Sequence, residues 1–176
     1  MRRSFRIIIT MLLVLVCFAG CTRKSPLESG LTALQNGEYE EAEKNFKEAI
    51  ERDILPGDAY RGIGIIRWEE EDYEKARDAF QLALENDAEK TATLYNFLGT
   101  CELRLGNAKA AVNDYNLGIG CEDASDEMLQ EMKYNMIVAY EQLGDWDTVR
   151  VKTKEYAEAY PDDERMAKEA EFFDTQ

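Results

Sequence analysis

Few side chains in this sequence are of the kinds that usually carry out acid–base or metal chemistry. The 176 residues include 36 Asp and Glu, 21 Lys and Arg, four Cys and no His. The absence of His removes the commonest general acid–base group and the commonest metal ligand. The acidic run at residues 69–72 resembles a metal cluster, but neighbouring residues of a helix do not face one site, so we interpret it as a solvated helix end. We therefore expect no enzyme activity, catalytic residue, metal site or cofactor.

Among the four cysteines, Cys21 has the clearest chemical role. Three Arg precede an apolar run at residues 7–18, which is shorter than the about 20 residues of a membrane span and is typical of a signal peptide. The segment 18–21 (Phe-Ala-Gly-Cys) resembles the lipobox of bacterial lipoproteins. This resemblance implies that the signal peptide 1–20 is cut off and that the new terminal cysteine is acylated, for example with palmitate. The alternatives are an uncleaved anchor and a secreted protein with an incidental cysteine.

Lipidation implies a location. Residues 21–25 would form the lipidated tether, and the protein would be anchored on the extracytoplasmic face of a bacterial cell membrane, or on the outer membrane where the source has one.

The net charge of -15 argues against a nucleic-acid partner, because phosphate contacts need clustered Lys and Arg.

Cys101 and Cys121 lie in the body of the chain. We expect them to fall on antiparallel helices, about 12 Å apart along the axis at about 1.5 Å per residue, which is too far for a disulfide. We expect Cys101 to be a buried small residue.

The elements that position these residues repeat along the chain. Two sets of landmarks recur with steps of 34 and then 35 residues, namely Ala42, Ala76 and Ala111, and Phe46, Phe80 and Tyr115. The residues flanking each turn include Gly37, Gly106 and Gly144, and the second block has Asp72 there without a glycine. A fourth, weaker block has Ile137 where the others have a small residue and Thr153 where they have an aromatic. Ser125 is the expected N-cap of its first helix.

The landmarks resemble the tetratricopeptide repeat (TPR) family, a helix-turn-helix of about 34 residues. The resemblance implies an all-α fold, a right-handed superhelical α-solenoid over residues 26–161 with four TPR units and a C-terminal capping helix. The expected units are residues 26–56, 57–90, 91–125 and 126–161. The capping helix and tail would occupy residues 162–176, with a frayed acidic tail as the alternative.

The resemblance also implies that one face of each first helix lines a concave groove that binds a protein partner. The groove residues carried onto this chain are Arg61, Ile65, Trp68, Asn96, Thr100, Leu103, Arg104, Tyr134 and Val138. Aromatic and Arg residues are frequent interaction hot spots, although Trp68 and Tyr134 could instead cover the core. The expected function is a membrane-anchored scaffold for a peptide or helix of an envelope protein. The alternatives are a pilotin-like assembly factor for pili or outer-membrane proteins and, from a different class, an enzyme or small-ligand receptor.

Arg67 and Glu102 occupy equivalent places one repeat apart. We expect either an ion pair between them across the stacking face or two independent solvated charges.

Overall fold

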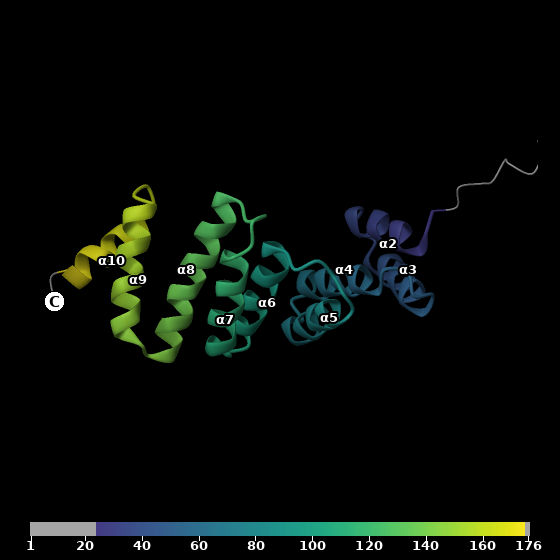
Figure 1. Cartoon of the computed structure of the whole chain (residues 1–176), viewed down its shortest axis with the longest axis horizontal. Coiled ribbons are helices and arrows are strands. Elements are labelled where there is room, and N and C mark those ends of the chain that lie inside the picture. The colour runs from purple at the N-terminus through teal and green to yellow at the C-terminus, as the bar shows by residue number, and fades with distance from the viewer. Residues whose placement is uncertain (1–23, 175–176) are drawn as a thin grey trace, which may run out of the picture.

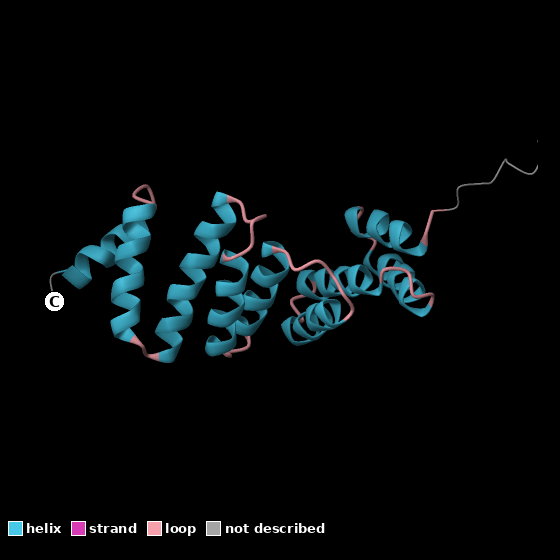
Figure 2. Cartoon of the chain, viewed as in Figure 1, coloured by secondary structure: helices cyan, strands magenta, loops and turns pink. Residues whose placement is uncertain are grey.

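The computed structural model describes residues 24–174, and this part of the chain is helical with no strand (Figure 2). The predicted signal peptide and Cys21 therefore lie outside the described residues. The helices are α2 (Pro26–Gln35), α3 (Tyr39–Glu51), α4 (Pro56–Glu69), α5 (Tyr73–Glu85), α6 (Ala92–Arg104), α7 (Ala108–Ile119), α8 (Asp126–Leu143), α9 (Trp146–Ala159) and α10 (Glu164–Asp174). They follow one another along the long axis, from α2 at one end to α10 at the other (Figure 1).

The helices pack as successive antiparallel pairs joined by short turns. The most extensive contacts join α2 with α3, α4 with α5, and α6 with α7. Each pair then packs on the next, with α3 against α4, α5 against α6, and α7 against α8. This arrangement confirms the predicted all-α solenoid of helix-turn-helix units. Because contacts run mainly between neighbours, each pair completes its core with side chains of the next one.

Local sequence signals explain where the helices begin and end. Ser25 and Glu28 form a capping box at α2, in which the Glu28 amide donates to Ser25 Oγ at 3.1 Å and the Ser25 amide donates to Glu28 Oε2 at 2.8 Å. The predicted cap at Ser125 is confirmed, because its Oγ accepts from the Met128 amide at 3.2 Å and α8 begins at Asp126.

The turns within the pairs place one residue in the left-handed backbone region. Gly37, Gly106 and Gly144 occupy this position with φ of 75°, 80° and 70°. Glycine suits it because a Cβ destabilises this conformation. In the second pair Glu71 takes the same position with φ of 59°.

The core of the first three pairs rests on a glycine of the first helix packed against an aromatic ring of the second. A Cβ added at Gly30 would come within 2.7 Å of the Phe46 ring, and one at Gly99 would come within 2.7 Å of the Tyr115 ring. Gly64 faces Phe80 in the same way. The helices of a pair can therefore approach closely only while these positions have no side chain.

Helix α10 ends the described solenoid. It packs on α9, where Met166 is buried in a cluster with Val149 and Tyr156. The Arg150 guanidinium lies 6.0 Å from the centre of the Phe173 ring. None of the described helices is both long and apolar enough to cross a membrane.

Candidate binding surface

The predicted groove residues lie on the first helices of the second, third and fourth pairs. Among the first helices, α2 contacts α4 and α6 contacts α8, whereas α4 and α6 meet through the rings of Trp68 and Phe97. A surface built from one helix of each stacked pair is extended and concave in solenoids. We call this surface of α2, α4, α6 and α8 the inner face.

Trp68 on α4 is half-buried in an aromatic cluster that joins the second and third pairs. Its ring lies edge-on to Tyr73 of α5 and to Phe97 of α6, each with a centroid distance of 5.2 Å. Phe97 is in turn stacked on Phe80 at 5.1 Å. Each such pair contributes about 0.5–1.5 kcal/mol beyond its buried area. Trp68 thus covers the core, as the alternative interpretation describes, and truncating it would disturb the stacking of pairs as well as the inner face.

Three further predicted residues surround this cluster. Ile65 packs against it from α4. Arg104 is exposed at the end of α6, with its guanidinium 5.9 Å from the centre of the Tyr73 ring. Arg61 forms an ion pair with Asp58 at 2.7 Å one turn earlier on α4. The structure therefore brings Ile65, Trp68 and Arg104 together around Tyr73 and its neighbours, and Arg61 lies further back along the same helix.

Asn96 and Thr100 on α6 differ in how well their polar groups are satisfied. The Thr100 hydroxyl shares a 3.0 Å hydrogen bond with the Tyr115 hydroxyl. This bond joins the inner helix α6 to α7. Burial raises the pKa of the Tyr115 hydroxyl to about 12. Asn96 Oδ1 is buried and has no hydrogen-bond partner among the described residues. A buried acceptor without a donor costs about 1–3 kcal/mol, so a ligand donor that draws the half-buried Asn96 side chain outward would relieve this cost.

The remaining predicted residues mostly build the core. Leu103 is only 9% exposed and belongs to the cluster of the third and fourth pairs, against which Val138 also packs. Tyr134 belongs to a different cluster at the C-terminal end, where its ring lies edge-on to Tyr156 at 6.2 Å. These three residues are therefore spread along the solenoid rather than gathered at one point.

The predicted ion pair between Arg67 and Glu102 is wrong. Arg67 pairs with Glu43 of α3 in the preceding repeat, and with Glu70 of α4 at 2.6 Å. Glu102 is buried and accepts a hydrogen bond from Asn107 Nδ2 at 2.7 Å. The reason is geometric, because the side chain at this place on a first helix faces the second helix of the preceding pair, not the next first helix.

Sequence reasoning missed Glu43 as the ion-pair partner of Arg67, although a residue at the equivalent place one repeat later, Arg77, is also charged. Glu43 and Arg77 are 34 residues apart, at equivalent places on α3 and α5. Hydrogen bonds from Lys47 and then the nearby Arg67 lower the pKa of Glu43. The pKa of Arg77 is raised first by its hydrogen bond to Asp78 and more weakly by Glu102. The two interfaces thus carry the same pair of charges in opposite order.

The cysteines of the body are free thiols. Cys101 is buried in the α5–α6 cluster, as expected of a small core residue, and burial raises the pKa of its thiol to about 12. Among the described residues, no group of three or more His, Cys, Asp or Glu is arranged to hold a metal ion.

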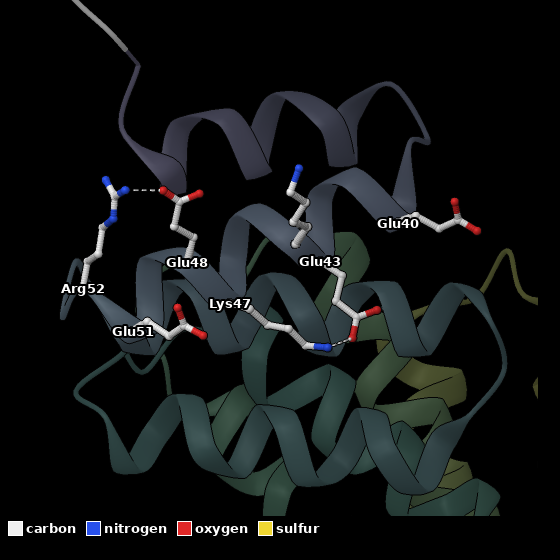
Figure 3. A pocket seen from close by; sticks show the side chains of 7 residues that line it. Glu40, Glu43, Lys47, Glu48, Glu51 and Arg52 are labelled. Atoms are coloured by element: carbon white, nitrogen blue, oxygen red, sulfur yellow. Dashed lines mark ion pairs between the residues drawn. The ribbon is translucent and has the colours of Figure 1, made fainter.

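A hollow of about 640 Å³ lies over α3 and is lined by charged side chains of that helix (Figure 3). Its cations are paired with carboxylates one turn away, Lys47 with Glu43 at 2.9 Å and Arg52 with Glu48 at 2.5 Å. Exposed pairs of this kind contribute about 0–1 kcal/mol. We interpret this hollow as a solvated helix surface without a converging set of ligand-binding groups.

Taken together, the paired helices, the glycine–aromatic packing and the inner face define a helical-repeat solenoid. Residues 27–91, which span most of the first two pairs, match the tetratricopeptide repeat family. The chain shares its fold with a crystal structure of YrrB, described as a TPR protein with an unusual peptide-binding site, with a TM-score of 0.74 and 20% identity over 90% of this chain and 80% of that one. A crystal structure of MamA protein is similar with a TM-score of 0.70 and 14% identity over 84% of this chain and 78% of that one. No curated protein matches the sequence.

Proposed function

We propose that the protein is a membrane-anchored scaffold whose inner face binds a peptide or helix of a cell-envelope protein. The proposal treats the whole solenoid as TPR units, although the family match covers the first two pairs. Its anchor is the acylated Cys21, and its partner-binding region centres on α4 and α6. Binding, and not catalysis, is the function that the fold and its side chains support.

The observation that carries the proposal is the unpartnered Asn96 Oδ1 on the inner face. An extended peptide offers backbone N–H donors, and the half-buried Asn96 side chain must turn outward for its buried Oδ1 to accept one. The exposed Arg104 and the half-buried Trp68 lie along the same face and offer a cation and an aromatic surface. The peptide-binding site named for the similarly folded YrrB supports the same class of ligand.

Partner binding is tested by affinity capture from the native envelope followed by mass spectrometry, then by calorimetry with the captured partner. We expect Asn96→Ala with Arg104→Ala to weaken binding about tenfold or more, because hydrogen bonds to charged groups are worth about 1.5–3 kcal/mol. The matched control is Gln81→Ala, an exposed polar residue on α5. Equal affinity of the double variant and the control would move the site away from this face.

The anchor is tested separately. Cys21→Ser removes the thiol that would carry the acyl chain, so the protein is expected in the soluble fraction and without acyl mass. Two or more acyl chains hold a protein firmly, since each buried CH₂ contributes about 0.8 kcal/mol. Unchanged membrane fractionation of the variant would reject lipidation at this residue.

A further inference from the structure

A second hollow, of about 220 Å³, lies between α7, α8 and α9. Its lining consists of Asn116, Ile119, Lys133, Met136, Lys152, Glu155 and Tyr156. We call it the α7–α9 hollow. On α8 it uses Lys133 and Met136, which lie on another side of the helix from Tyr134 and Val138, because successive helical residues are about 100° apart. The hollow is therefore separate from the inner face.

Three of the residues that line the α7–α9 hollow, Ile119, Met136 and Tyr156, are apolar or aromatic and pack in core clusters. Met136 is 6% exposed and Tyr156 is 3% exposed, and both belong to core clusters. The Tyr156 hydroxyl accepts from Gln130 Nε2 at 3.1 Å and donates to Asp163 Oδ2 at 3.0 Å, which fixes the ring. Half-buried Ile119 contributes a further apolar surface from α7. The hollow thus offers a preformed apolar surface for a compact apolar group.

Two ammonium groups border this apolar surface. Lys133 Nζ donates to the Tyr160 hydroxyl at 3.3 Å and lies 5.3 Å from the centre of that ring. Lys152 Nζ pairs with Glu155 at 2.8 Å, and about a third of the Lys152 side chain is exposed. Two lysines and one glutamate give the lining a positive balance, in a chain whose net charge is -15.

Charge and size together select the ligand. A single negative charge neutralises the lining, whereas a polyanion would be repelled by the acidic body of the protein. Small-molecule pockets usually enclose about 300–1,000 Å³, so this smaller hollow has room for one compact apolar group and not for a whole cofactor. A carboxylate joined directly to that group would reach the lysines while the apolar part contacts Met136 and Tyr156.

We propose that the α7–α9 hollow binds a monocarboxylate carrying one compact apolar group. This chemistry has two sources, a free organic acid and the C-terminal residue of a peptide. The proposal does not depend on the inner face, because the two surfaces share no residue.

The test uses the purified full-length protein in detergent and two pairs of probes. The first pair is 4-methylpentanoate and 4-methylpentanamide, which have the same apolar group but differ in charge. The second pair is a tetrapeptide of three alanines and a C-terminal leucine, with a free carboxylate or with an amide. Binding is followed by calorimetry and by NMR shifts of residues on α7, α8 and α9.

We expect both acids to bind about tenfold or more tightly than their amides, and Lys133→Gln and Lys152→Gln each to weaken acid binding about tenfold. Lys109→Gln, an exposed lysine of α7 outside the hollow, removes the same charge and should leave binding unchanged. Tighter binding of the peptide acid assigns a peptide C-terminus, and tighter binding of 4-methylpentanoate assigns a free acid. Equal binding of acid and amide, unchanged binding by both lysine variants, or no binding of any probe would overturn the proposal.

Discussion

In the first three helical pairs a glycine on the first helix lies against an aromatic ring on the second, sixteen residues later in the sequence. In the fourth pair the equivalent positions hold Ile137 and Thr153, and both are fully buried, at 1% and 0% exposure. In the fourth pair the larger side chain therefore lies on the first helix and the smaller one on the second, the reverse of the other pairs. Because cores tolerate changes that conserve volume, the repeat signature is one of two ways to fill the same space.

The glycine–aromatic packing and the Ile137–Thr153 packing should differ most when the side chain on the second helix is truncated to alanine. Phe80→Ala should lower the free energy of unfolding by about 3–5 kcal/mol, since Phe80 is fully buried against Gly64 and Phe97. Thr153→Ala in the fourth pair should cost less than about 1 kcal/mol, because it removes only a methyl and an unpaired hydroxyl. Urea denaturation of both variants measures the difference. Similar losses of unfolding free energy in the two variants would show that Ile137 of the first helix does not supply most of the buried side-chain volume in the fourth pair.

A volume exchange can be tested within the fourth pair itself. Ile137→Gly leaves a cavity and Thr153→Tyr overfills the site, so each single variant should be destabilised by about 1–3 kcal/mol or more. The double variant recreates the combination of Gly99 and Tyr115, and should recover stability through a coupling energy of about 0.5–3 kcal/mol. A double-mutant cycle measures that coupling. Strict additivity would contradict the exchange.

The second and third pairs differ beside the aromatic residue. Buried Ala79 precedes Phe80, whereas Asp114 precedes Tyr115. Burial, and secondarily the charge of Glu102, raises the pKa of Asp114 to about 6. A raised carboxyl pKa favours folding below the unfolded pKa of about 4, and this contribution is lost as pH rises through about 6.

Asp114→Ala should therefore flatten the pH dependence of stability between about pH 4 and 6 and stabilise the protein at pH 7 by about 1 kcal/mol, after allowance for solvent screening. Denaturation midpoints at several pH values measure both effects. Asp114→Asn is the control that keeps the shape without the charge. A variant that stays as sensitive to pH as the parent would assign the dependence to other carboxyls.

Removing the hydroxyl group of Tyr115 or of Thr153, at equivalent positions of their second helices, should change stability by a smaller amount. Tyr115→Phe breaks the 3.0 Å bond to Thr100 and should cost about 1 kcal/mol. Thr153→Val removes a buried hydroxyl that has no partner among the described residues, and should stabilise the protein by about 0.5–1 kcal/mol. Thermal denaturation of the two variants should therefore shift in opposite directions.

Periodicity in the sequence predicted the solenoid, because one repeat geometry imposes the same spacing on many residues at once. It also marked Ile137 and Thr153 as departures, but not that they compensate each other, since that depends on which side chains face across the pair. The contacts of the inner face were harder to predict, because they also depend on which side chains face one another. Spacing placed Trp68 and Asn96 on one side of their helices, but only packing distinguishes the half-buried ring of Trp68 from the unpartnered Asn96 Oδ1. The charge at Arg67 was assigned to the wrong neighbour because sequence equivalence does not say which helix a side chain faces.

The smallest expected effect concerns the turns, where the second pair is the exception. Glu71 has φ of 59°, at the position held by glycine in the other three pairs. A left-handed conformation costs a residue with a Cβ about 1–2 kcal/mol, whereas glycine costs about 0.4–1 kcal/mol through the greater freedom of the unfolded chain. The first effect is the larger, so Glu71→Gly should stabilise the protein by about 0.5–1 kcal/mol.

Charge must be separated from backbone in this comparison, because residues 69–72 are all acidic and removing one carboxylate also relieves repulsion. Glu71→Ala removes the same charge but keeps the Cβ, so the difference between the alanine and glycine variants isolates the backbone contribution. Gly37→Ala, with φ of 75°, should lose the amount of stability by which Glu71→Gly exceeds Glu71→Ala. Chemical denaturation of all three variants measures these changes. If the alanine and glycine variants at residue 71 were equally stable, the backbone strain in the turn of the second pair would be no larger than the entropy cost of glycine.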